Sequence, residues 1–427
     1  MDILPVKGLQ GELWVPGDKS ISHRALIISS LASGTSKITG FLSGEDCLST
    51  MGCLRQLGVK ILERSSANLE VQGGGLHGFK EPLSPLNAGN SGTTARLLLG
   101  LLAGQDFFSV ITGDESLSNR PMKRVVKPLQ EMGAAIIGRQ NNNLLPLAIR
   151  GNKLKGIDYK LPVASAQLKS ALLLAGLLAD SPTIIEEPGS SRDHTERMLT
   201  YFGVQLKKDK HKIFLVPGQE LQARDIAIPG DFSSAAFFIV GALITPESEL
   251  TIKNVGVNPT RTGLLYVLQR MGANITLLNQ RLVCGEPVAD IYVISSKLRG
   301  TIIEGSIIPT LIDEIPALVS AALFAEGDTV IRDAQELRVK ETDRIAALVS
   351  EFSKIGGSVS ELPDGLVVHG NKKIIGGRCH SFRDHRIAMA LAIAALRAQG
   401  KTTVIDSDCV SISYPNFFKD LAGVTIV

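Results

Sequence analysis

The sequence predicts an α/β fold of two domains, each built from three repeated helix/strand units. With 427 residues the chain is too long for one ordinary hydrophobic core, which favours two large domains. An apolar segment rich in small residues recurs six times, roughly every 70 residues, and a β-rich segment follows each copy. Each unit then holds a second expected helix, a glycine and another strand.

The six apolar segments are predicted to be the first helix of each unit. They are apolar nearly all round, which is typical of a helix buried inside a domain, and their small residues allow close packing. They span residues 25–32, 95–103, 171–179, 235–244, 317–325 and 388–398. The β-rich segments that follow span residues 36–39, 107–111, 183–185, 250–252, 329–331 and 402–405.

The second helix of each unit is expected to end at a glycine, where the backbone needs a positive φ. These glycines are Gly58, Gly133, Gly203, Gly272, Gly356 and Gly423. The repeat is much longer than the roughly 20–50 residues of a solenoid unit. We therefore expect two closed groups of three units, with the seam near residues 217–229.

Composition limits the classes of function. The chain is 44% hydrophobic and 20% charged with a net charge of +3, which indicates a globular protein and excludes nucleic-acid binding by bulk charge. Its five cysteines show no metal-finger spacing and suit a reducing compartment. Neither a signal peptide nor an apolar run of about 18 residues is evident. We expect a cytoplasmic protein that binds no membrane.

Polar residues and glycines gather at the start of every inner helix. If the inner helices of a domain run parallel, these starts emerge on one face, where free N–H groups and the helix dipole favour anions. Simple N-capping is the alternative explanation for the Ser, Asn and Asp residues. The cations beside them favour anion binding. The six starts are residues 17–24, 87–96, 163–167, 230–234, 311–314 and 383–386.

Two basic segments stand out in the second and fifth units, at residues 117–124 and 338–344. Ser20 and Arg24 are four residues apart, and so are Lys340 and Arg344. Each pair is therefore expected on one helical face. A solvated helix face is the alternative explanation for such a charge run. Lys340 and Arg344 are candidates to bind phosphate or carboxylate, with Glu341 as an acid or base between them.

Four motifs together resemble the 3-phosphoshikimate 1-carboxyvinyltransferase (EPSP synthase) family: Gly17–Arg24, Asn90–Thr93, Arg338–Arg344 and Asp384–Arg386. The resemblance runs from about Gly11 to Pro415. It implies an inside-out α/β barrel, the enolpyruvyl transferase fold. The implied domains are residues 15–228 and residues 1–14 plus 229–427, with the active site in the cleft between them.

The resemblance also implies a reaction: the enolpyruvyl group of phosphoenolpyruvate passes to the 5-hydroxyl of shikimate 3-phosphate by addition and elimination, and phosphate is released. Such an enzyme serves aromatic amino acid biosynthesis, needs no metal or cofactor, acts as a monomer and is a target of glyphosate. The implied catalytic residues are Asp313, Glu341 and Lys19. Those for phosphoenolpyruvate are Lys19, Gly92, Arg120, Gln167, Arg344, His385 and Arg386. Those for shikimate 3-phosphate are Lys19, Ser20, Arg24, Ser165, Gln167, Arg192, Asp313 and Lys340.

Three residues depart from the family pattern. Ala166 stands where many relatives have serine, Leu97 replaces a common proline, and Ile412 replaces a phosphate-binding lysine. The phosphate site then either lacks one cation or takes it from elsewhere. One rival is the sibling transferase that acts on UDP-N-acetylglucosamine, but residues 112–124 lack its loop cysteine. Another is a non-enzymatic repeat scaffold, which would carry apolar or aromatic residues at the helix starts.

Overall fold

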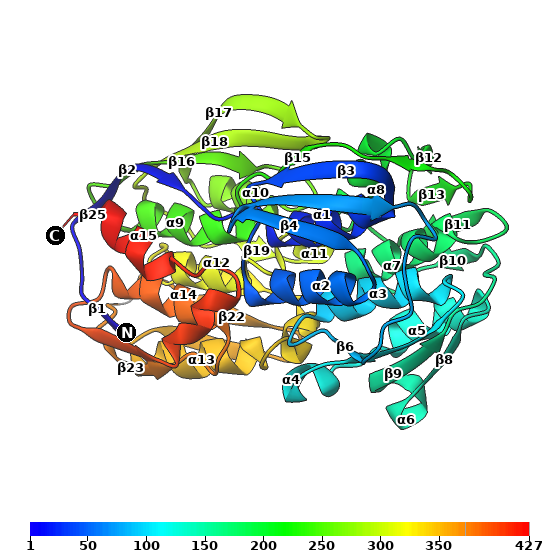
Figure 1. The fold of residues 1–427 in the computed structure, drawn as a ribbon. Helices are drawn as coiled ribbons and strands as arrows, with labels where there is room; N and C mark the ends of the chain where they lie inside the picture. The colour runs from blue at the N-terminus through cyan, green and yellow to red at the C-terminus, as the bar shows by residue number, and fades with distance from the viewer. Residues whose placement is uncertain (372, 427) are drawn as a thin grey trace. The chain divides into compact units, whose positions relative to one another are not determined.

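A computed structural model of the chain describes residues 1–371 and 373–426 and divides into two compact units (Figure 1). The first, here called the 17–228 unit, comprises Gly17–Ile228 and Val283–Glu286. The second, the 229–427 unit, comprises Met1–Pro16, Pro229–Leu282 and Pro287–Val427. Each unit has its own hydrophobic core.

Each of the six predicted inner segments overlaps a helix, and four of them run one to three residues past its end. The helices are α1 (Lys19–Leu31), α3 (Gly92–Ala103), α7 (Ala166–Leu177), α9 (Phe232–Ile244), α12 (Ile315–Ala322) and α14 (His385–Ala395). Each begins before the apolar segment, in most cases because a polar first turn is helical as well, whereas α12 begins with the apolar residues Ile315 and Pro316. Every residue of α9 is buried, and this helix packs against β16 and β2 in the same unit (Figure 1). The predicted burial of the inner helices is confirmed.

The second helices are α2 (Glu45–Gln56), α5 (Lys123–Glu131), α8 (His194–Tyr201), α10 (Gly263–Arg270), α13 (Arg344–Lys354) and α15 (Phe417–Val424). Five of the predicted glycines follow them with φ between 89° and 101°, as a helix terminus of this kind requires. The prediction for Gly423 is wrong. This residue lies inside α15, which continues to Val424 before the chain enters a short strand.

Five of the six sheets formed by the described residues share one strand order. A strand pairs in parallel with the strand after the inner helix, and an antiparallel hairpin completes the sheet. The 17–228 unit has three such sheets. In the first, β14 (Leu221–Gln222) and β15 (Ile226–Ala227) pair with β3 (Ala32–Thr39), which is followed by β5 (Asn68–Gly74) and β4 (Lys60–Ser65). The second has the order β6 (Leu86–Asn87), β7 (Phe108–Thr112), β9 (Leu144–Arg150) and β8 (Ala135–Gly138), and the third has the order β10 (Asp158–Lys160), β11 (Thr183–Glu186), β13 (Lys212–Leu215) and β12 (Leu206–Asp209).

In the 229–427 unit, the two N-terminal strands complete two of the sheets. Its two full sheets are β17 (Asn274–Val283), β18 (Glu286–Ile294), β16 (Glu249–Gly256), β2 (Gly8–Trp14) and β25 (Thr425–Ile426); and β19 (Ile302–Ile303), β20 (Asp328–Ile331), β22 (Gly365–His369) and β21 (Ser358–Leu362). The sixth sheet is shorter and comprises β23 (Gly377–His380), β24 (Thr402–Ile405) and β1 (Asp2–Ile3). β1 takes the hairpin's place, and the last strand joins β2 instead, which is why the sixth repeat lacks its glycine turn.

Short helical segments complete the fold: α4 (Glu115–Ser118), α6 (Arg139–Asn142), α11 (Ile308–Leu311), and the 3-10 segments η1 (Gly305–Ile307), η2 (Gln335–Val339) and η3 (Ser407–Ile412). Within the described residues, no single helix is long and apolar enough to cross a membrane. One sharply bent pair, Gly305–Leu311 with Ile315–Ala322, passes that test by length and composition only.

Candidate functional site

The starts of the inner helices lie together within each unit. In the 17–228 unit, Arg24 of α1 donates to Ser170 in the first turns of α7, and Gln167 of α7 donates to Thr93 of α3. In the 229–427 unit, Ser233 of α9 donates to Glu314, and Arg386 of α14 donates to the carbonyl of the neighbouring Asp313. The expectation that the starts emerge together is confirmed within each unit.

N-capping accounts for part of the polar pattern. Side chains cap five of the six inner helices, whereas Glu314 before α12 makes no such bond. The five capping residues are Asp18, Ser91, Ser165, Asp231 and Asp384. The alternative explanation therefore holds for these residues. It does not explain the cations that accompany them.

Arg24 lies almost wholly buried on α1 and bridges three helices. Its Nη1 donates to the carbonyl of Ser20 at 2.9 Å, which confirms that the two share a helical face. Its Nε donates to Thr195 Oγ1 on α8 at 2.7 Å, and its Nη2 to Ser170 Oγ on α7 at 2.8 Å. Burial, with a smaller contribution from Arg192, lowers the pKa of Arg24 to about 10 against the opposing effects of Glu196 and Asp18. An anion near Arg24 would stabilise its positive charge.

Lys19 opens α1 and forms an ion pair with Asp46, with Nζ 3.0 Å from Oδ2. Both side chains are only partly exposed. In the same helix His23 is buried, and its Nδ1 lies 2.7 Å from Thr50 Oγ1. Burial lowers the pKa of His23 well below its usual value, and Lys19 and Arg24 lower it further. The first turns of α1 therefore hold two cations and a neutral imidazole.

A hydrogen-bonded chain holds the start of α3. Arg96 Nη1 donates to Gln167 Oε1 at 2.6 Å, and Gln167 Nε2 donates to Thr93 Oγ1 at 3.0 Å. The ideal Cβ of an alanine at Gly92 would lie 2.9 Å from Arg96 Nη1. Glycine at this position therefore leaves room for the arginine that orients Gln167.

Arg120 follows α4 and reaches back to the loop before α3. Its Nη2 donates to Asn90 Oδ1 at 2.8 Å and to Ser116 Oγ at 3.2 Å. Ser165 caps α7, and Arg192 lies half-buried in the loop before α8. All predicted site residues between Lys19 and Arg192 thus belong to the 17–228 unit.

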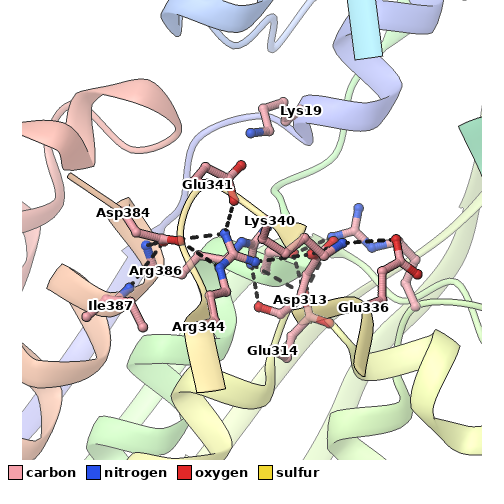
Figure 2. Close-up of polar contacts among 12 residues, drawn as sticks. Lys19, Asp313, Glu314, Glu336, Lys340, Glu341, Arg344, Asp384, Arg386 and Ile387 are labelled. Atoms are coloured by element: carbon pink, nitrogen blue, oxygen red, sulfur yellow. Dashed lines mark hydrogen bonds and ion pairs between the residues drawn. The ribbon is translucent and has the colours of Figure 1, made fainter. Parts of the chain in front are cut away.

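Arg344 is the centre of the charge cluster in the 229–427 unit (Figure 2). Its guanidinium contacts three carboxylates: Nε lies 2.8 Å from Asp384 Oδ2, Nη2 lies 2.6 Å from Glu341 Oε2, and Nη1 lies 3.6 Å from Asp313 Oδ1. Burial by itself lowers the pKa of Arg344, but Asp384 and Glu341 outweigh it and raise the pKa above its ordinary value. Arg344 is a permanent cation with a fixed orientation, not part of a solvated helix face.

Lys340 also contacts the Asp313 carboxylate, although it lies before the start of α13. Its Nζ lies 3.5 Å from Asp313 Oδ1 and 3.5 Å from Glu336 Oε1 (Figure 2). The prediction that Lys340 and Arg344 share a helical face is wrong. Lys340 has an extended backbone after η2, and α13 begins only at Arg344, because Asp343 caps the helix there. The two cations nevertheless meet at one oxygen of Asp313.

Arg386 is fixed by the residues before α12. Its Nη1 donates to the Asp313 carbonyl at 2.8 Å and lies 3.8 Å from Glu314 Oε1. Glu314 is fully buried, and its carboxylate also accepts a hydrogen bond from Ser233. His385, the first residue of α14, is buried beside Arg386. The predicted residues Asp313, Lys340, Glu341, Arg344 and Arg386 are therefore brought together in one unit.

Sequence reasoning missed Asp46 and Glu314, which pair with Lys19 and Arg386, and the buried ion pairs of Lys169 with Glu187 and Glu196. A signal existed for two of these residues. Lys169 is a charged residue two positions before the apolar segment 171–179, and Glu314 directly follows Asp313 at a helix start. Of the departures, Leu97 is buried in α3, Ala166 opens α7, and Ile412 ends η3 with its side chain partly buried. Across residues 1–371 and 373–426, no group of three His, Cys, Asp or Glu side chains fits a metal ion.

Comparison with known proteins decides the family. The family model described as EPSP synthase (3-phosphoshikimate 1-carboxyvinyltransferase) matches residues 3–421. The chain belongs to the EPSP synthase family. A 3-phosphoshikimate 1-carboxyvinyltransferase of Desulforudis audaxviator is 58% identical over 417 residues, covering 98% of this chain and 97% of the relative. One from Desulforamulus reducens is 52% identical over 424 residues, covering 99% of each.

A solved structure extends the EPSP synthase comparison to the fold. EPSP synthase from Acinetobacter baumannii superposes with a TM-score of 0.90 at 45% identity, covering 100% of this chain and 98% of that one. The predicted α/β architecture of two three-unit domains is thereby confirmed. The resemblance first seen in four short motifs extends over the whole chain.

Proposed function

We propose that this EPSP synthase family member transfers the enolpyruvyl group of phosphoenolpyruvate to the 5-hydroxyl of shikimate 3-phosphate, releasing phosphate. The observation that carries the proposal is the cluster in which Asp313, Glu341 and Arg344 meet beside Lys340. It supplies carboxylates for proton transfer and cations for anionic substrates at one place. We further propose that this cluster and the cations of the 17–228 unit act together on one pair of substrates, in a cleft between domains 15–228 and 1–14 plus 229–427.

Asp313 suits the role of base for the acceptor hydroxyl. Its Oδ1 has Lys340 Nζ at 3.5 Å and Arg344 Nη1 at 3.6 Å, and such cations favour the negatively charged carboxylate that a base requires. When the hydroxyl oxygen adds to C2 of phosphoenolpyruvate, its proton passes to Asp313. Removing that proton increases the nucleophilicity of the oxygen.

Glu341 and Lys19 are proposed to serve the methylene carbon. In the addition step C3 of phosphoenolpyruvate gains a proton and becomes a methyl group, and in the elimination step it loses one while phosphate departs. Glu341 must be protonated to act as the acid, and its contact with Arg344 at 2.6 Å opposes this. The negative charges of a bound phosphate and carboxylate partly offset Arg344, which favours the protonated form when substrate is present.

Binding of phosphoenolpyruvate is assigned to cations that the structure already holds in place. Arg344 and Arg386 are anchored by carboxylates and by the Asp313 carbonyl, Arg120 by Asn90, and Lys19 by Asp46. Fixed cations stabilise developing charge without reorganisation during the reaction. Gln167, Gly92 and His385 complete the proposed set.

Shikimate 3-phosphate is assigned to Lys19, Ser20, Arg24, Ser165, Gln167, Arg192, Asp313 and Lys340. Arg24 and Arg192 carry positive charges that suit a dianionic phosphate, since the anion would neutralise both. Ser165 offers a hydroxyl beside the start of α7, where the helix dipole also favours negative charge.

Phosphate release from phosphoenolpyruvate tests the reaction. The purified chain is assayed with shikimate 3-phosphate and, in parallel, with UDP-N-acetylglucosamine, the acceptor of the sibling transferase. Release only with shikimate 3-phosphate supports the proposal. Release only with the nucleotide sugar, or with neither acceptor, contradicts it.

We propose that the reaction needs no metal or cofactor and that the protein binds neither nucleic acid nor membrane. We also propose that it acts as a monomer in the cytoplasm. Activity that survives chelation by EDTA and a single monomeric mass in light scattering are the expected results. Loss of activity that added metal restores would refute the metal-free reaction. A dimeric mass at assay concentration would refute the monomer.

A further inference from the structure

We propose that Lys169 is a positioning residue: with Glu187 and Glu196 it aligns Arg24 and the loop that carries Arg192 to receive the phosphate of shikimate 3-phosphate. The inference rests on the proposed function, because it assigns a role in binding that substrate. All of these residues belong to the 17–228 unit.

Lys169 is a buried charge in an apolar helix. Its side chain has no exposed surface, although the neighbouring residues of α7 are mostly Leu and Ala. Its Nζ lies 2.9 Å from Glu187 Oε2 and 2.7 Å from Glu196 Oε1. Buried ion pairs are often no more stabilising than apolar residues of the same size. Stability alone therefore gives little reason for a lysine at this position.

The contacts of Lys169 close the loop between β11 and α8. Glu187 is the first residue of that loop, and Ser191 lies four residues further along it. Nζ donates to Glu187 and, at 3.5 Å, to the carbonyl of Ser191, while the Ser191 hydroxyl donates to the other Glu187 oxygen. Arg192 is the next residue. The path of the chain into Arg192 is thus set by one ammonium group and one carboxylate.

The same cluster reaches Arg24. Glu196 lies beside Thr195, which accepts a hydrogen bond from Arg24 Nε at 2.7 Å. Ser170, next to Lys169 on α7, accepts from Arg24 Nη2 at 2.8 Å and lies 2.6 Å from Thr195 Oγ1. Glu196 also attracts Arg24 electrostatically. The sequence neighbours of Glu196 and Lys169 therefore contact Arg24, and the residue after Ser191 is Arg192.

Charge balance explains why a lysine is needed. Lys169 places one buried cation against the two buried carboxylates that it contacts, Glu187 and Glu196. Without Lys169, the carboxylates would compete with the substrate phosphate for Arg24. With it, Arg24 and Arg192 remain oriented for an external anion.

The test compares two acceptors that differ by the phosphate alone. For Lys169→Met, kcat/KM is measured with shikimate 3-phosphate and with shikimate, both at saturating phosphoenolpyruvate. We expect kcat/KM for shikimate 3-phosphate to fall about 10- to 100-fold, as misplaced binding groups commonly cause, while that for shikimate changes less than about twofold. A parallel fall for both acceptors, or no fall for either, would overturn the proposal.

Two further variants keep the result decisive. Lys169→Met combined with Glu187→Gln removes one cation and one carboxylate together, so it tests the same prediction if the single variant does not fold. Lys253→Met is the control, since Lys253 lies 2.9 Å from Asp290 in the 229–427 unit, and its two kcat/KM values should keep the wild-type ratio. If the wild-type chain does not use shikimate 3-phosphate, the proposed function fails first and separately.

Discussion

Arg344 and Asp384 form a bidentate ion pair in which both side chains are almost completely buried. Nε lies 2.8 Å from Oδ2 and Nη2 lies 3.3 Å from Oδ1. Asp384 Oδ1 also accepts from the backbone N–H of Arg386 at 2.9 Å. One carboxylate thus orients the guanidinium of one proposed phosphoenolpyruvate ligand and caps the helix that carries another.

Asp384→Asn isolates the charge of this pair, because asparagine can still cap α14. Loss of one partner leaves Arg344 short of a buried counter-charge, so we expect the free energy of unfolding to fall by about 3–5 kcal/mol. Asp343→Asn is the matched control. Asp343 caps α13 and pairs with Arg338 at the surface, so its loss should cost no more than about 1 kcal/mol. Urea unfolding of both variants measures the difference, and equal costs would contradict the argument.

Replacing either residue proposed to act on the methylene carbon, Lys19 or Glu341, should lower turnover without unfolding the chain. Lys19→Met and Glu341→Ala should each lower kcat by about 10²–10⁴-fold, which is the usual contribution of a positioned acid or base. Glu336→Ala is the control, since Glu336 contacts Lys340 from a more exposed position. Steady-state phosphate release measures kcat. Near-normal turnover in Lys19→Met or Glu341→Ala would remove that residue from the proposed mechanism.

A methyl group at Gly92 is expected to disturb substrate binding more than folding. Its carbon would lie 2.9 Å from Arg96 Nη1, the end of a flexible side chain that moves aside easily. The movement breaks the contact with Gln167, so in Gly92→Ala we expect the KM for phosphoenolpyruvate to rise by up to about 100-fold. Gly52→Ala on α2 is the control, because no heavy atom lies within 4 Å of its added carbon. An unchanged KM in Gly92→Ala would show that the loop tolerates the displacement.

The repeat made much of the fold predictable, and its failures have physical causes. Gly58 and Gly356 were predictable because a helix terminus with positive φ has few alternatives to glycine. The prediction for Gly423 was wrong because the last strand pairs with β2, far away in the sequence, and no local signal indicates that pairing.

The candidate site was predictable as residue types at helix starts but not as contacts. Lys340 and Arg344 were expected on one helix from their spacing alone. The structure instead brings them together through Asp313, a residue 27 positions before Lys340 in the sequence. Lys169 was overlooked for a related reason: its partners follow it by one strand and one loop, and only the folded chain places them beside α7.

Because His23 is buried, we expect the folded chain to lose stability in mild acid. Burial lowers the pKa of His23 well below 6.5, and the nearby charges of Lys19 and Arg24 act in the same direction. The folded chain therefore keeps the imidazole neutral, whereas the unfolded chain binds a proton as the pH falls below about 6.5. Because the unfolded state then binds more protons, the free energy of unfolding decreases with falling pH, and the contribution is complete only above that pH. Relative to His23→Asn, the wild-type chain should lose up to about 1.4 kcal/mol more per pH unit below about pH 6. Urea unfolding from about pH 8 to about pH 5 measures the slope. His77→Asn, at an exposed histidine, should retain the wild-type slope, and a His23→Asn variant with that same slope would refute the prediction.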